Sequence, residues 1–238
     1  MGAAGLGIRS RRGSLGVMIR ALILDFDGLI LDTEGPAYQS WVEIFEEFGA
    51  ELPLSAWEAW LGGSPDMFDP CGYLEGQVGH SVDCEGLTRR QREREEELNV
   101  IQSTLPGVAQ YIADAKRLGL KLGVASSSDR PWVERHLGRL GLLQEFDCLK
   151  CAEDVARVKP SPDLYLAVLD ELGLRPAEAI AFEDSPNGIT SAQAAGLLCV
   201  AVPNPLTRQL STDHADLHLS SLEEVSLEEL LLRTKKRG

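Results

Sequence analysis

The chain has 238 residues, of which 44% are hydrophobic and 25% are charged, which is ordinary for a globular protein with a substantial core. Its net charge is -14, although residues 1–20 carry four Arg and residues 233–237 carry two Lys and two Arg. So acidic a body argues against nucleic acid as a partner, because a phosphate backbone requires a basic surface. The same charge suits a cation.

The cysteines and the hydropathy indicate a cytoplasmic protein. Five cysteines form an odd number spread through a mid-sized chain, so we expect reduced thiols rather than a disulfide framework. Cys148 and Cys151 form a CxxC, but no second CxxC or CxxH completes a zinc site, and we expect buried core thiols. No apolar run approaches the roughly 18 to 20 residues of a membrane span. We expect no membrane partner, and a monomer, with a dimer left open.

The segment 1–17 is rich in Gly, Arg and Ser and contains no acidic residue. That composition also suits a transit peptide. We expect a disordered extension ahead of an alternative start at Met18, because the first strand begins almost at once after it.

Short apolar runs that alternate with helical patterns predict the fold class. Residues 108–118 and the three later helical segments each end in an apolar residue, Gly and Leu, and Gly supplies the left-handed residue that follows a helix. Strands joined by helices run parallel, so we predict an α/β fold with a doubly wound, Rossmann-like parallel sheet. The expected strands are 21–24, 120–125, 146–151, 179–182 and 198–202, and the later helices are 133–140, 164–172 and 188–195.

One stretch interrupts this alternation. Residues 35–104 contain no convincing strand, whereas 38–48 and 87–101 have the pattern of amphipathic helices. We therefore expect a helical cap at 35–104, inserted into an α/β core formed by 18–34 and 105–238. The alternating charges at 89–97 favour a solvated helix face over an anion-binding one.

Polar side chains follow the predicted strands, and ligands of an open parallel sheet bind beyond the carboxyl ends of its strands. Singly, each of these side chains fits a helix cap, a turn or a solvated surface. Together, their carboxylates would raise each other's pKa unless a cation compensates, and oxygen ligands without His favour Mg²⁺ over zinc. The residues are Asp25, Asp27, Ser126, Lys159, Glu183 and Asp184.

The remaining chemistry of this set suits phosphoryl transfer. Lys159 and the Ser126 hydroxyl supply a cation and a donor for phosphate oxygens. A carboxylate such as Asp25 can act as the nucleophile by forming an aspartyl phosphate. Asp27, two residues further along an extended strand, lies on the same side and can act as acid and then as base.

In this order and spacing, the motifs resemble those of the haloacid dehalogenase superfamily, in the branch that contains β-phosphoglucomutase and sugar-phosphate phosphatases. The first motif occupies 25–34, and Ser126, Lys159-Pro160 and 183–188 supply the other three. The resemblance covers about 180 residues.

The resemblance implies a role for each residue. Asp25 would be the nucleophile and a metal ligand, and Asp27 the general acid/base, with its backbone carbonyl on the metal. Asp184 would be a further ligand, and Glu183 would ligate the metal or orient a metal-bound water. The implied metal is Mg²⁺. Ser126 and Lys159 would hold the phosphoryl group, with Lys159 also orienting Asp25, while the helical cap closes over the site and contacts the leaving group.

Departures from the family pattern narrow the reaction. Dehalogenases of this superfamily lack the second aspartate, whereas Asp27 is present here. Phosphonate-cleaving relatives need a cap lysine, and this chain has none before Lys116. The mutases carry a His where this chain has Ala37, and a Gly-x-Ser-Arg pattern where it reads Gly62-Gly63-Ser64-Pro65.

We therefore predict a Mg²⁺-dependent phosphatase that hydrolyses a small, sugar-like phosphomonoester through an aspartyl phosphate. A hexose-phosphate mutase of the β-phosphoglucomutase type is the first alternative. A non-catalytic, metal-binding interaction protein is the second.

Overall fold

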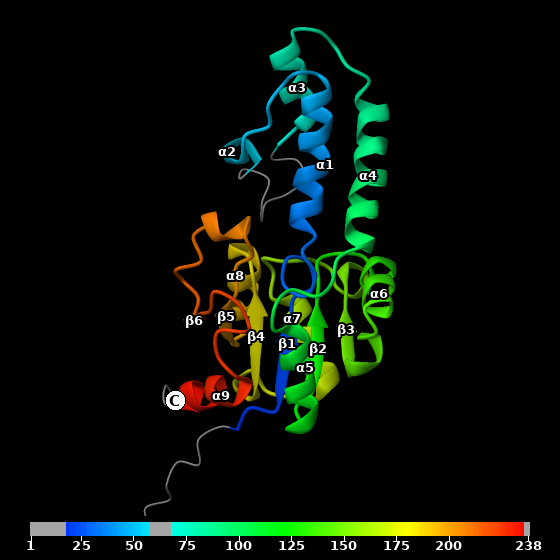
Figure 1. Ribbon diagram of the computed structural model, residues 1–238. Helices are drawn as coiled ribbons and strands as arrows, with labels where there is room; N and C mark the ends of the chain where they lie inside the picture. The colour runs from blue at the N-terminus through cyan, green and yellow to red at the C-terminus, as the bar shows by residue number, and fades with distance from the viewer. Residues whose placement is uncertain (1–17, 58–67, 236–238) are drawn as a thin grey trace, which may run out of the picture.

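The computed structural model describes residues 18–57 and 68–235, so the segment 1–17 and the Gly62–Pro65 pattern lie outside the described residues. One sheet of six parallel strands, in the order β3-β2-β1-β4-β5-β6, forms the centre of the described chain (Figure 1). The predicted doubly wound parallel sheet is thereby confirmed. Its strands are β1 (Ala21–Leu24), β2 (Lys121–Ala125), β3 (Cys148–Lys150), β4 (Ala179–Glu183), β5 (Leu198–Ala201) and β6 (Leu217–His218).

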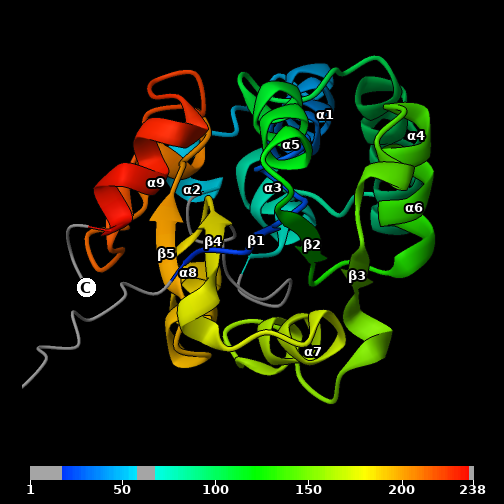
Figure 2. The same cartoon turned by 90° about the horizontal axis from the view of Figure 1, so that it is seen from below.

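Helices cover both faces of the sheet (Figure 2). Successive side chains of a strand point to opposite faces, so Leu22 and Leu24 join one core cluster while Ala21 and Ile23 join the other. Burying each large aliphatic side chain contributes about 1.5–3 kcal/mol. One face carries α5 (Val108–Arg117), α6 (Arg130–Arg139) and α9 (Leu227–Lys235), and the other carries α7 (Asp163–Leu172) and α8 (Pro186–Ala194).

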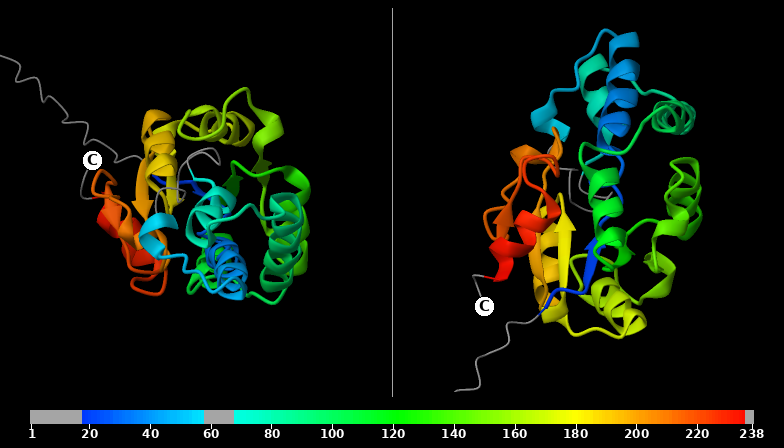
Figure 3. Two further views of the ribbon diagram at one scale, coloured as in Figure 1. Left: turned by 90° about the horizontal axis from the view of Figure 1, so that it is seen from above. Right: turned by 60° about the horizontal axis from the view of Figure 1, so that its bottom comes forward.

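A set of helices that we call the helical insert separates β1 from α5 and stands above the carboxyl ends of the strands (Figures 1 and 3). Its own core contains the buried Phe45 and Trp57. The two long helices are also joined by a buried hydrogen bond, in which Gln91 Nε2 donates to Ser40 Oγ at 2.9 Å. The insert consists of α1 (Glu34–Glu47), α2 (Leu54–Trp57), α3 (Pro70–Val78) and α4 (Cys84–Val100).

Several boundaries differ from those expected. The strand predicted at 146–151 is only Cys148–Lys150. Helix α6 begins at Arg130 rather than at 133, because the Asp129 carboxylate caps its first turn by accepting the backbone N–H of Trp132 at 2.8 Å. Apolar periodicity alone does not mark such a turn, and it also left α9 and the two-residue β6 unpredicted.

The cysteines agree with the sequence-based expectation. The five cysteines are free, and Cys148 and Cys151 are buried as predicted. Across residues 18–57 and 68–235, no helix is both long enough and apolar enough to cross a membrane.

Candidate active site

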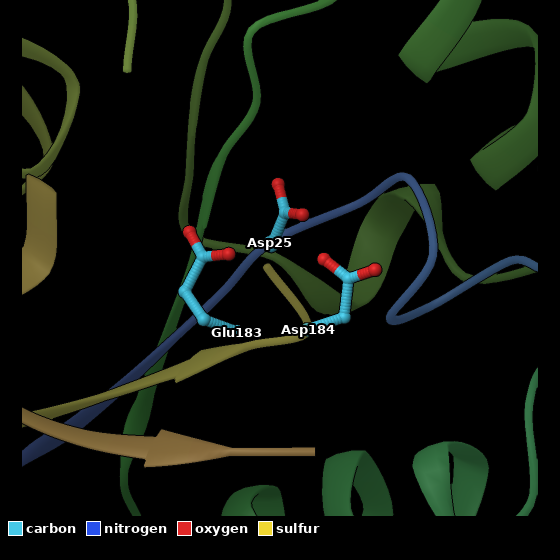
Figure 4. Close-up of side chains that lie close together, drawn as sticks. All are labelled: Asp25, Glu183 and Asp184. Carbon is cyan, nitrogen blue, oxygen red and sulfur yellow. The ribbon is translucent and has the colours of Figure 1, made fainter. Parts of the chain in front are cut away.

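Three buried carboxylates converge at the carboxyl edge of the sheet. Asp25 follows β1, and Glu183 ends the neighbouring strand β4. Leu24 pairs with Phe182 in the parallel register, so the next residues, Asp25 and Glu183, lie side by side. Asp184 follows directly. Their carboxyl groups face a common point (Figure 4), and one oxygen of each lies within 4.8 Å of the others.

Lys159 lies beside this carboxylate cluster. Its Nζ is 2.5 Å from Asp25 Oδ1 and 2.7 Å from Glu183 Oε1, and its side chain is buried. The alternative of a solvated surface lysine is therefore wrong. Burial alone would lower the pKa of Lys159, but the Asp25 and Glu183 carboxylates outweigh it and raise that pKa above its usual value.

One ammonium group does not neutralise the cluster. Burial raises the pKa of Asp25 to about 8, Glu183 adds to this, and Lys159 offsets only part of it. Burial and the Asp25 charge likewise raise the pKa of Asp184. Glu183 Oε1 accepts the Tyr165 hydroxyl at 2.5 Å, whereas its buried Oε2 has no hydrogen-bond partner among the described residues. Excess buried negative charge and an orphaned carboxylate oxygen fit a hard divalent cation.

Two glycines leave room for these carboxylates, and an asparagine side chain binds one of them. Gly28 has a φ of +77°, and a Cβ there would lie 2.2 Å from Asp184 Oδ2. A Cβ on Gly188, in the first turn of α8, would lie 1.9 Å from Glu183 Oε2. Asn204 Nδ2 donates to Asp184 Oδ2 at 2.9 Å. The sequence analysis did not single out Asn204, whose position depends on the fold alone.

Asp27 is held on a different side of the site. Its Oδ2 accepts the Ser128 hydroxyl at 2.6 Å and the Ser126 hydroxyl at 3.3 Å, and its Oδ1 accepts the Trp132 indole N–H at 2.9 Å. Ser126, expected to contact phosphate, thus contacts Asp27 in this structure. The sequence offered a partial signal for Ser128, in the run of three serines, and none for Trp132.

The aromatic donor is fixed by its own helix. The Asp129 cap sets the first turn of α6, which directs Trp132 toward the loop after β1. His136, one turn later and buried, packs against the indole with ring centroids 4.3 Å apart. Asp27 is therefore hydrogen-bonded to a side chain that packs against the core.

A cavity of about 870 Å³ opens between the sheet edge and the helical insert. Its size is in the usual range of a small-molecule site. The core lines it with Asp25, Asp27, Lys159 and Asp184, and the insert contributes Glu34, Ala37 and Glu95.

Glu34, in the first turn of α1, and Glu95, on α4, were not expected to line the site. Burial and then the Asp27 charge raise the pKa of Glu34 to about 7, with Asp32 and Glu95 adding to the effect. Burial also raises the pKa of Glu95, although Gln91 Nε2 donates to it at 2.9 Å. The prediction of a solvated helix face at 89–97 is wrong for Glu95.

Comparison with known proteins agrees with this architecture. The sequence profile of the haloacid dehalogenase-like hydrolases matches residues 22–202. The chain therefore belongs to this family, as its motifs predicted.

Individual relatives show the enzyme type. A Bacillus subtilis protein named "Putative phosphatase YhcW" is 48% identical over 214 residues, which cover 90% of this chain and 97% of that protein. Hexitol phosphatase B of Escherichia coli is 31% identical over 226 residues, covering 90% and 97%. The structure of CbbY from Rhodobacter sphaeroides in complex with phosphate is 31% identical and covers 87% of this chain and 96% of its own, with a TM-score of 0.66. The prediction of a phosphatase of the haloacid dehalogenase type is confirmed.

Proposed function

We propose that the chain is a Mg²⁺-dependent phosphatase that hydrolyses a small, sugar-like phosphomonoester through an aspartyl phosphate on Asp25. The observation that carries the proposal is the position of the Asp25 carboxylate at the floor of the cavity. Lys159 pairs with both Asp25 and Glu183, and the Asp184 carboxylate completes the cluster. The nucleophile, the Lys159 ammonium group and the candidate metal site would thus all contact the phosphoryl group of a bound substrate.

In the first step, an Asp25 carboxylate oxygen attacks phosphorus, and the bond from phosphorus to the ester oxygen breaks. The leaving alkoxide takes a proton from Asp27. Lys159 remains paired with Asp25 and offsets charge on the phosphoryl oxygens, while Ser126 can turn from Asp27 to donate to them.

In the second step, water gives its proton to Asp27 and attacks the phosphorus of the aspartyl phosphate. This releases inorganic phosphate and restores the Asp25 carboxylate. Asp25, Asp184 and the backbone carbonyl of Asp27 would hold the Mg²⁺, with Glu183 binding it directly or through water. The ion would neutralise charge on the transferring phosphoryl group.

The helical insert would act as the cap of this site. It covers the carboxyl ends of the strands and lines the same cavity, so it can contact the leaving group and exclude bulk water. At the position of the mutase histidine, Ala37 lines the cavity and offers no polar side chain. Water is therefore the proposed acceptor, rather than the second sugar hydroxyl that a mutase would use.

The test is phosphate release from a panel of phosphomonoesters with Mg²⁺, using the wild type and Asp25→Asn. We expect Asp25→Asn to lower kcat by on the order of 10⁴-fold or more, because it removes the nucleophile. Asp170→Asn, on the exposed side of α7, is the matched control and should keep full activity. Substantial turnover by Asp25→Asn would contradict the proposal.

A further inference from the structure

The cavity wall that the helical insert contributes has an unusual charge. The floor carries the carboxylate cluster together with Lys159, whereas the wall formed by the insert presents Glu34 and Glu95. These two residues come from different helices, α1 and α4, and their charges interact with each other. An ester whose phosphoryl group lies at Asp25 would extend its alcohol part toward this wall.

No basic side chain of the described residues neutralises the wall. The only basic residue lining the described cavity is Lys159, which is bound to Asp25 and Glu183. On α4, Arg94 pairs with Glu43 at 2.8 Å, away from the cavity lining. Arg92 is exposed, lies outside the lining and offsets only part of the Glu95 charge.

Residues 58–67, which the structure does not describe, contain no Lys, Arg or His in their sequence. In the part of the insert that the structure describes, two carboxylates and no cation line the cavity.

The two wall carboxylates also have hydrogen-bonding capacity to spare. Glu95 accepts one hydrogen bond, from Gln91, and no hydrogen bond of the described residues involves the Glu34 carboxylate. Carboxylates accept hydrogen bonds from hydroxyl and ammonium groups, and repel a second phosphate or carboxylate. At an effective dielectric of about 20, one such repulsion across the cavity weakens binding by about tenfold or more.

We propose that Glu34 and Glu95 select the substrate by charge, admitting phosphomonoesters of hydroxyl-bearing or amino-bearing alcohols and rejecting those with a second anionic group. This inference rests on the proposed phosphatase function. It assigns the enzyme to monophosphates of neutral or cationic polyols, and it excludes bisphosphates and phosphorylated acids as good substrates.

The experiment measures inhibition of p-nitrophenyl phosphate hydrolysis at pH 7.5, with Mg²⁺ and constant ionic strength. Three competitors share one carbon skeleton: glucosamine 6-phosphate, glucose 6-phosphate and 6-phosphogluconate. For the wild type we expect an inhibition constant at least tenfold higher for 6-phosphogluconate than for glucose 6-phosphate. Glucosamine 6-phosphate should bind at least as tightly as glucose 6-phosphate.

The variants identify the groups responsible. In the double variant Glu34→Gln with Glu95→Gln, the ratio of the inhibition constants for 6-phosphogluconate and glucose 6-phosphate should fall to within about threefold of one. Glu93→Gln removes the same charge from the exposed side of α4, outside the cavity lining, and should leave the wild-type ratio unchanged.

Each outcome decides between the two proposals. Equal inhibition constants in the wild type, or a ratio that the double variant leaves unchanged, would overturn selection by Glu34 and Glu95 while leaving the phosphatase proposal intact. A wild-type enzyme that hydrolyses no phosphomonoester at all would overturn the phosphatase proposal, and this inference with it.

Discussion

Two groups of carboxylates face one cavity, and they differ in what surrounds them. On the floor, Asp25, Glu183 and Asp184 are buried and held by Lys159, Tyr165 and Asn204. On the wall, Glu34 and Glu95 are only partly buried and receive a single hydrogen bond, from Gln91. The same side-chain chemistry is thus held by several partners on the floor, where we propose a cation and a phosphoryl group bind, and has few partners on the wall.

Removal of metal should show the largest difference between the floor carboxylates and the wall carboxylates, because only the floor is proposed to bind the ion. We expect EDTA to reduce phosphatase activity by more than about 10³-fold, because the floor would lose the cation that offsets its charge. Added Mg²⁺ should restore it. The wall variants Glu34→Gln and Glu95→Gln should keep the same Mg²⁺ dependence, measured as the concentration giving half-maximal rate. Full activity after exhaustive chelation would contradict a metal role for the floor.

Loss of the Lys159 ammonium group should have the next largest effect. We expect Lys159→Met to lower kcat by about 10²–10³-fold, since it removes one preorganised positive group from the phosphoryl site. It also leaves Asp25 and Glu183 uncompensated, so it should lower the free energy of unfolding by about 3–5 kcal/mol. Lys121→Met, whose lysine binds the Leu172 carbonyl on the surface, is the control. Steady-state kinetics and urea unfolding check both effects.

A smaller effect is expected from a change at Trp132, whose indole N–H donates to Asp27. Trp132→Phe keeps the ring against His136 but removes the N–H that binds Asp27. A hydrogen bond to a charged group is worth about 1.5–3 kcal/mol, so we expect kcat to fall by about tenfold or more with little change in KM. An unchanged kcat would argue against a positioning role for Trp132. So would a loss of folding free energy as large as the loss calculated from kcat.

The smallest effect should be a pH-dependent gain in stability at the wall. The native pKa of Glu34, about 7, exceeds the ordinary value of 4.5, so the native state binds this proton more tightly than the unfolded state. The stabilisation is complete below about pH 4.5 and is lost as the pH rises through 7. We expect Glu34→Gln to be more stable than the wild type at pH 8 by about 1–2 kcal/mol, because solvent screens part of the interaction.

The measurement is urea unfolding at pH 5 and pH 8 in EDTA. At pH 5 the two proteins should have nearly the same free energy of unfolding. A Glu34→Gln variant that is less stable than the wild type at pH 8 would show that this carboxylate is not electrostatically frustrated in the native state.

The sequence predicted the order of the core elements because their signals are local. Buried strands such as 21–24 and 179–182 are continuous apolar runs, and a glycine follows each of the helices α5, α6, α7 and α8. The six residues of the motifs follow from the same logic, since parallel strands bring their carboxyl ends to one edge. What apolar periodicity did not predict was the first turn of α6, which Asp129 caps.

Sequence alone therefore determined the family, the sheet and the set of residues that meet at the floor. Only the tertiary structure decided the surroundings of those residues. Trp132 reaches Asp27 across 105 positions of the chain, and Asn204 reaches Asp184 from a loop after β5. Glu95, which has the sequence environment of a solvated helix, lines the same cavity as Asp25 and Asp184 because α4 packs on α1 above the sheet. Such contacts depend on how distant elements pack, and no short-range pattern encodes them.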